Sequence, residues 1–205
     1  MGEGREPEQL PQDLAFWSVT ASRHVFRDRW VSLRADSCRT ARGAEIDPYY
    51  ILELADWVQV VAVTPDRELV MIRQYRHGLR GISLEVPSGV IDAADDGPLA
   101  AAARELAEET GYEAGSFELV GRLSPVVARL DNTISVVLAR NARPVRAPAA
   151  DETEVVSLQL MSCEEAVRQA LTGGMVEASQ IAALLMALRH GGLIDIAVTA
   201  GAPPG

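Results

Sequence analysis

The amino-acid sequence predicts an α+β fold, because β-like and helical segments occupy different stretches of the chain. Three β-like runs open the sequence, further runs flank a helix near its middle, and two helices follow the last strand. The expected strands are 19–26, 30–38, 49–54, 57–64, 68–75, 117–123, 133–140 and 155–161, and the expected helices are 98–110, 163–171 and 177–189.

Length and composition fit a globular protein of one domain, or of one domain with an appendage. The chain has 205 residues, of which 48% are hydrophobic and 23% are charged, so it can bury a sizeable core. We expect a flexible lead, an N-terminal β unit, a main domain and a flexible tail. Their predicted bounds are 1–15, 16–56, 57–196 and 197–205.

Charge and cysteine content exclude several classes of partner. The net charge of −10 predicts no nucleic-acid partner, since binding to a phosphate backbone depends on clustered Lys and Arg. No apolar run approaches the length of a membrane span, so we expect no membrane partner. Cys38 and Cys163 are far apart in sequence, which favours a reducing compartment over a disulfide framework. The acidic, polar N-terminus does not resemble a signal peptide, and we expect a cytoplasmic protein.

The segment 98–110 carries the signals of a helix with defined ends. It contains an alanine run, and alanine is the strongest helix former. Pro98 suits the first helical position, and Gly111 suits the position just after the end. Apolar residues recur at helical spacing and predict a stripe that faces the core. This stripe consists of Leu99, Ala103 and Leu106.

Three carboxylates lie within five residues of this helix. Glu105 and Glu109 are four residues apart and share a helix face, with Glu108 beside them. Like charges at this spacing repel, and a hard divalent cation such as Mg²⁺ would remove the conflict. Arg104 precedes Glu108 by four residues and can hold its carboxylate. The alternative is a solvated helix face with one Arg–Glu pair.

The stretch from Pro87 to Tyr112 resembles the signature of the Nudix family. That signature runs Gly, five residues, Glu, seven residues, then Arg-Glu-apolar-x-Glu-Glu-x-Gly-apolar, and its second half is intact from Arg104 to Tyr112. The first half departs from it. If Asp96 stands for the first Glu, the gap to Arg104 is kept, but six residues follow Gly89 instead of five.

The resemblance implies a fold and a cofactor. The fold is an α/β/α sandwich with a mixed sheet, covering about 57–190, preceded by the N-terminal antiparallel β unit. The cofactor is Mg²⁺, with Mn²⁺ as the alternative. The implied metal-binding set is the Ser88 carbonyl with Glu105, Glu108, Glu109 and Glu154.

Further residues match the ADP-ribose and nucleotide-sugar pyrophosphatase subgroup. Arg76, in the segment Gln74-Tyr75-Arg76, would face the substrate diphosphate, although a surface arginine is an equal alternative. Glu85 would anchor the turn or touch the ligand. Trp30 and the other N-terminal aromatics Trp17, Phe26 and Tyr50 are candidates for stacking on a purine, although core or interface positions are commoner.

Two loops complete the predicted site. The loop at 124–132 lacks the glutamate that many relatives carry there and offers Arg129 as a substrate-binding cation. The acidic loop that begins at Asp151 resembles the loop that supplies a catalytic base, which here would be Glu152. A solvated acidic loop is the alternative. We expect the catalytic chemistry from Glu152, Glu108 and Arg104.

The resemblance implies hydrolysis of a nucleoside diphosphate linked to a second group. ADP-ribose, cleaved to AMP and ribose 5-phosphate, is the first expected substrate, and another nucleotide sugar is the second. The N-terminal sheet often builds a dimer in the subgroup that the chain resembles, so the resemblance also implies a homodimer. Two alternatives stay open. One is a Nudix-like nucleotide sensor without turnover, and the other is an interaction protein whose acidic residues are only surface.

Overall fold

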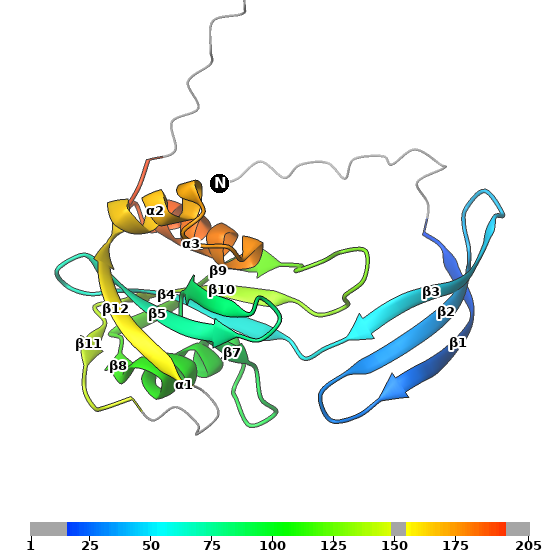
Figure 1. Cartoon of the computed structure of the whole chain (residues 1–205), viewed down its shortest axis with the longest axis horizontal. Coiled ribbons are helices and arrows are strands. Elements are labelled where there is room, and N and C mark those ends of the chain that lie inside the picture. The colour runs from blue at the N-terminus through cyan, green and yellow to red at the C-terminus, as the bar shows by residue number, and fades with distance from the viewer. Residues whose placement is uncertain (1–15, 149–154, 196–205) are drawn as a thin grey trace, which may run out of the picture. The chain divides into compact units, whose positions relative to one another are not determined.

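The computed structural model describes residues 16–148 and 155–195 (Figure 1). The described chain forms two compact units. The first unit contains residues 16–54 and the segment 126–132, and the second contains the remaining described residues. The lead at 1–15 and the tail at 197–205 lie outside the described residues.

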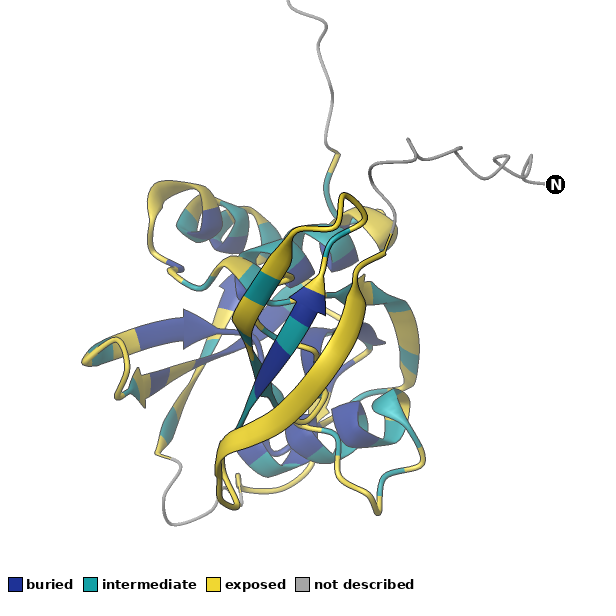
Figure 2. Cartoon of the chain, turned by 90° about the vertical axis from the view of Figure 1, so that its right-hand side faces the viewer, coloured by how far each residue is buried: buried dark blue, intermediate teal, exposed yellow. Residues whose placement is uncertain are grey.

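The first unit is a three-stranded antiparallel sheet in the order β1-β2-β3. Its strands are β1 (Ser18–Arg27), β2 (Ser32–Arg39) and β3 (Glu45–Glu53). The turn between β2 and β3 contains Gly43 at a φ of 81°, in the left-handed region that glycine adopts without steric cost. All ten residues of β1 are exposed (Figure 2), and β1 pairs only with β2 among the described strands.

The segment 126–132 belongs to this first unit because it packs along β3. The Tyr49 hydroxyl donates a hydrogen bond to the Ala128 carbonyl at 2.5 Å, and the Leu52 amide donates to the Arg129 carbonyl at 2.8 Å. The Arg129 guanidinium lies 4.9 Å from the centre of the Tyr49 ring. The side chain of Arg129 is therefore held by β3.

The second unit is built on a mixed seven-stranded sheet. Its main order is β12-β5-β4-β10-β9, with β6 paired to β5 and β7 paired to β4. Strands β4 and β10 are parallel, and the other pairs are antiparallel. The strands are β4 (Trp57–Val63), β5 (Glu68–Arg76), β6 (Gly81–Glu85), β7 (Ser88–Val90), β9 (Ser116–Leu123), β10 (Ile134–Arg140) and β12 (Val156–Ser162).

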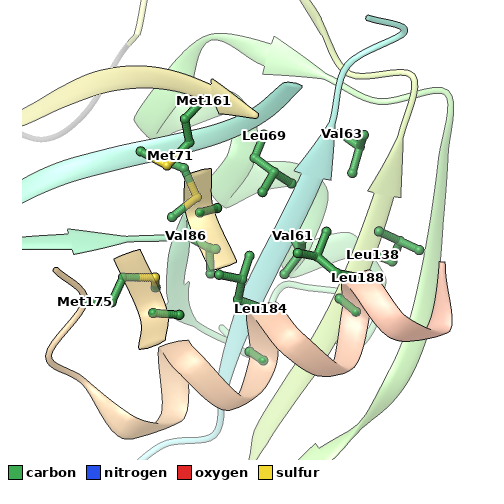
Figure 3. Packing of buried hydrophobic residues seen from close by; sticks show 14 of the residues in the cluster. Val61, Val63, Leu69, Met71, Val86, Leu138, Met161, Met175, Leu184 and Leu188 are labelled. Carbon is green, nitrogen blue, oxygen red and sulfur yellow. The ribbon is translucent and has the colours of Figure 1, made fainter. Parts of the chain in front are cut away.

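Helices cover both faces of this sheet, which confirms the predicted α/β/α sandwich. Helix α1 (Pro98–Thr110) lies on one face, and α2 (Cys163–Thr172) and α3 (Ala178–His190) lie on the other. Strand β4 is buried on both sides because alternate residues point to opposite faces. Val58 and Val60 join the cluster under α1, whereas Val61 and Val63 join the cluster under α2 and α3 (Figure 3). None of the helices in the described part of the chain is long and apolar enough to cross a membrane.

Local signals predicted most helix ends correctly. Pro98 occupies the first turn of α1, and Gly111 ends α1 in the left-handed conformation at a φ of 75°. A Cβ on Gly111 would also lie 2.1 Å from the Arg146 carbonyl oxygen. Ser162 caps α2 by accepting the Glu165 amide at 3.1 Å.

Two sequence predictions about the fold were wrong. The expected strands include none between 140 and 155, but Arg143–Pro144 (β11) pairs with Tyr112–Glu113 (β8). The apolar stripe of α1 is also different, since Leu99 is 39% exposed. The buried face of α1 instead combines small or apolar residues with two acids. Its members are Ala101, Ala102, Glu105, Leu106, Ala107, Glu109 and Thr110.

Candidate active site

The short strand β7 brings the candidate site together. Its residues Ser88, Gly89 and Val90 pair with Gln59, Val58 and Trp57 of β4, and β7 also contacts α1. A Cβ added to Gly89 would lie 2.0 Å from Oε1 of Glu105, which is far inside contact distance. Only glycine leaves room for the Glu105 carboxylate at this point of the strand.

Glu109 approaches the same strand from the next turn of α1. It is 3% exposed, and its Oε2 accepts a hydrogen bond from the Ser88 amide at 3.0 Å. A hydrogen bond to a carboxylate is charge-assisted and fixes its orientation. Glu105 and Glu109 therefore both lie against β7, beside the backbone of Ser88 and Gly89.

Arg104 ties the helix to the loop that precedes it. Its guanidinium donates to both Asp95 oxygens at 2.9 and 3.1 Å, to Glu105 at 2.7 Å and to Glu108 at 3.1 Å. It also donates to the Val90 carbonyl at 2.9 Å. The hydrogen bond to Asp95 is the main cause that raises the pKa of Arg104, and the same contact lowers the pKa of Asp95.

Asp95, and not Asp96, pairs with Arg104. The interpretation that Asp96 stands for the first acid of the signature was wrong. The Asp95 side chain is 8% exposed, whereas Asp96 is an exposed residue. Asp95 follows Gly89 after five residues, so the first half of the family spacing is kept. The extra residue lies between Asp95 and Arg104, where the loop before α1 absorbs it.

Replacing Asp95 by Asn should destabilise the protein, while Asp96→Asn should not. Loss of a charge-assisted pair to Arg104 is expected to cost about 1–2 kcal/mol, and an exposed change stays within about 0.5 kcal/mol. Thermal unfolding of both variants measures the difference.

Because Arg104 lowers the pKa of Asp95, the stabilising contribution of Asp95 is present above the unfolded-state pKa of about 3.9 and is lost as pH falls through the lower folded-state pKa. The difference in unfolding free energy between the native protein and Asp95→Asn should therefore become smaller at acidic pH. Equal effects of the two variants would contradict the assignment.

Arg76 and Glu85 form the second charged element of the site. Glu85 is fully buried and accepts two hydrogen bonds from Arg76, at 2.9 and 2.5 Å. This pair is the main cause that raises the pKa of Arg76, and the charges of Glu177 and Glu109 raise it further. Neither of the two roles predicted for Glu85 named this contact to Arg76. The Arg76–Glu85 pair fixes the half-exposed Arg76 side chain, whose permanent positive charge interacts with the negative charge of Glu109.

The donor atoms around β7 suit a hard divalent ion. The carboxylates of Glu105, Glu108 and Glu109 and the backbone of Ser88 supply oxygen, which Mg²⁺ prefers. The Glu105 carboxylate fills the space that a Cβ on Gly89 would take, so carboxylate and backbone meet there. Within residues 16–148 and 155–195, no three His, Cys, Asp or Glu side chains form a cluster that could hold a metal by themselves. A backbone oxygen, a substrate phosphate or an acid outside these ranges would complete the set.

The structure brings together most predicted site residues, but not all. Those of the second unit are Arg76, Glu85, Ser88, Arg104, Glu105, Glu108 and Glu109. Trp30 and Arg129 belong to the first unit. Trp30 is 71% exposed and lies under the Arg29 guanidinium, 4.4 Å from it. Glu152 and Glu154 lie outside the described residues.

The sequence predicted a helix at 177–189 but no site residue within it, whereas the structure brings the first turn of α3 to Ser88 of β7. Gln180 is 1% exposed and accepts the Val86 amide at 2.8 Å. Glu177 contributes to the field around Arg76. No regular spacing along the sequence connects these residues with the signature that begins at Gly89. The only signal was a polar glutamine on a helix whose other inward residues are apolar.

Comparison with known proteins matches two family models. Residues 55–184 match the NUDIX domain, and residues 17–52 match the nucleoside diphosphate sugar hydrolase N-terminal domain.

Two relatives and one solved structure resemble most of the chain. An ADP-ribose pyrophosphatase of Mycobacterium tuberculosis is 32% identical over 155 residues, which cover 75% of this chain and 74% of the relative. A methanol dehydrogenase activator of Bacillus methanolicus is 30% identical over 145 residues, which cover 70% of this chain and 77% of the relative. The crystal structure of an ADP compounds hydrolase has the same fold, with a TM-score of 0.76 at 23% identity, over 88% of this chain and 98% of the other.

Proposed function

Because the chain belongs to the Nudix family of hydrolases, we propose that it cleaves ADP-ribose to AMP and ribose 5-phosphate in a Mg²⁺-dependent reaction. The observation that carries the proposal is the meeting of Glu105 and Glu109 at the Ser88–Gly89 backbone, beside the Arg76–Glu85 pair. The family as a whole uses divalent metal ions, and the chain is a pyrophosphohydrolase of nucleotide-linked substrates.

The proposed reaction consumes one water molecule. The water oxygen forms a bond to one phosphorus of the diphosphate, and the bond from that phosphorus to the bridging oxygen breaks. The bridging oxygen leaves with the other phosphate, and the protons of the water are shared between the base and the products. The two products are phosphate monoesters, so atoms and charge balance without another reactant.

Four residues would hold the metal, namely Ser88 through its carbonyl and Glu105, Glu108 and Glu109 through their carboxylates. When bound, Mg²⁺ neutralises the diphosphate and makes a water molecule more acidic. Mn²⁺ has the same ligand preference and is expected to substitute. Arg104 holds two of these carboxylates, since it donates to Glu105 and Glu108.

Arg76 and the acidic loop would act on the diphosphate from the protein side. Arg76 carries a permanent charge that can face a phosphate oxygen, and Glu85 prevents the side chain from turning away. Glu152 is proposed as the general base that takes a proton from the attacking water. Glu154 is proposed as a further metal-facing acid of the same loop.

The first unit is proposed to bind the nucleotide base and to form a homodimer. Residues 17–52 match the N-terminal domain family of nucleoside diphosphate sugar hydrolases, which supports a base-binding role for Trp30. Arg129, in the segment 126–132 of the same unit, is proposed as a substrate-binding cation. The edge strand β1 exposes Val19, Val25 and Phe26, which supports association with a second copy. Light scattering at micromolar concentration should give the mass of a dimer, and a monomer mass would contradict this part of the proposal.

A cytoplasmic location is also proposed. Cys38 and Cys163 both lie in the described residues and form no disulfide, which supports a reducing environment.

The function is tested by product analysis on a small substrate panel. The panel contains ADP-ribose, several nucleotide sugars, NADH and nucleoside triphosphates, each with Mg²⁺ and with a chelator. AMP and ribose 5-phosphate from ADP-ribose, only with metal, would support the proposal. Faster cleavage of a nucleotide sugar would move the substrate to that class. Binding of a panel member without turnover would favour the sensor alternative.

A further inference from the structure

Helix α3 reaches the strand that carries the proposed metal-binding carbonyl. Gln180, in its first turn, is 1% exposed. Its Oε1 accepts the Val86 amide at 2.8 Å, and its Nε2 donates to the Ser88 hydroxyl at 3.4 Å. One buried side chain therefore spans the connection between β6 and β7 on both sides of Pro87.

A second buried amide joins the same level of the sheet to the same turn of α3. Gln59 is the ladder partner of Ser88, and its Nε2 donates to the Ser179 hydroxyl at 2.9 Å. The Ser179 hydroxyl donates to Glu177 at 2.5 Å. The Val60 amide binds the Pro87 carbonyl at 2.8 Å and closes the connection on β4. Position 88 is thus held through its own side chain and through its neighbour across the ladder.

Helix α1 holds the same position from the opposite face of the sheet. The Ser88 amide donates to Glu109, while Gln180 contacts the residue from the side of α3. The Ser88 peptide therefore lies between α1, which carries the proposed metal-binding carboxylates, and α3, which carries none of them.

Packing alone does not explain an amide at position 180. The other inward residues of α3 are apolar, and Leu184, one turn further on, belongs to the same core cluster as Val86 (Figure 3). The remaining members of this inward face are Ala183, Ala187 and Leu188. A buried amide is costly unless both of its ends are hydrogen-bonded, and an apolar side chain would fill the space without that requirement.

We infer that Gln180 is a positioning residue of the metal site, which sets the Ser88 carbonyl and, through the Ser88 amide, the Glu109 carboxylate. This role rests on the proposed function, because it assumes that the Ser88 backbone and Glu109 bind the metal. Gln180 itself touches neither metal nor substrate.

The test uses Mn²⁺ as the probe and needs no substrate. Mn²⁺ is titrated into the native full-length chain and into Gln180→Met, and the free ion is followed by electron paramagnetic resonance. Met keeps the length and apolar bulk of Gln but removes both hydrogen bonds. The Mn²⁺ dissociation constant is expected to rise about tenfold to hundredfold, as for other residues that orient metal ligands. The metal concentration for half-maximal activity should rise in parallel, while KM for the substrate at saturating metal stays unchanged.

Leu184→Ala is the matched control on the same helix. It removes core packing beside Val86, so it should lower Tm by more than Gln180→Met while leaving the Mn²⁺ dissociation constant unchanged. A native Mn²⁺ affinity in folded Gln180→Met would overturn the inference, as would an equal loss of affinity in the control.

Gln180→Asn covers the case in which Gln180→Met does not fold. Its shorter side chain cannot keep both contacts and changes the core less, so it should also weaken Mn²⁺ binding, and a native affinity would count against the inference. Measurements on the native chain distinguish failure of this inference from failure of the proposed function. If the native chain binds Mn²⁺ but does not cleave ADP-ribose, the proposed substrate is contradicted, and the Mn²⁺ titration of the Gln180 variants still tests the role of Gln180.

Discussion

Glu109→Gln is expected to lower Mg²⁺-dependent hydrolysis by about three orders of magnitude or more. The carboxylate is 3% exposed and accepts the Ser88 amide. Gln has the same shape, and its carbonyl oxygen can still accept this hydrogen bond, so the fold should persist. What is lost is the negative charge at the proposed metal, which an amide cannot replace. The variant should therefore have a native unfolding temperature and almost no activity.

The control for this prediction is Glu113→Gln. Glu113 is exposed in β8, and the same chemical change there should leave both activity and Mn²⁺ binding at native levels. Steady-state kinetics across a range of Mg²⁺ concentrations compare the two variants. Activity of Glu109→Gln within tenfold of native would remove Glu109 from the proposed metal site and would leave its carboxylate the role of a structural partner of the Ser88 amide.

Gly89→Ala is expected to reduce activity by about a hundredfold or more, because it displaces the proposed metal ligand Glu105 without changing any charge. A Cβ at this position would lie 2.0 Å from Oε1 and 2.1 Å from Cδ of Glu105. Either the carboxylate leaves the strand or β7 moves by about an ångström, and a misplacement of that size costs about 10²-fold in rate. Overpacking should also destabilise the protein by about 1–3 kcal/mol.

Gly115→Ala is the matched control, since its Cβ would meet its nearest neighbour, the Asn141 Cβ, at an ordinary 3.4 Å. Activity assays with the Mn²⁺ titration, and chemical denaturation for stability, measure both effects. Native activity in Gly89→Ala would mean that Glu105 does not need its position against β7, and the proposed ligand set would have to change.

The sequence by itself determined the features that depend on neighbours along the chain. Proline at the start and glycine at the end bound α1, and the Arg104–Tyr112 half of the Nudix signature identifies the family. These signals act through backbone dihedrals, hydrogen bonds within one helical turn and spacing along a helix. For that reason they can be read without knowledge of the rest of the fold.

Only the tertiary structure decided which of several similar residues meets a distant partner. Asp95 and Asp96 are adjacent and chemically equal, and the path of the loop alone places Asp95 against Arg104. The buried face of α1 was predicted wrongly because it depends on β7, which has only three residues and is too short to show an alternating apolar pattern in the sequence. The contact between β7 and α1 places Glu105 and Glu109 on the buried face of the helix. Gln180 acts on residues more than ninety positions earlier. Such contacts depend on how helices pack across a sheet, and that packing leaves no periodic trace in the sequence.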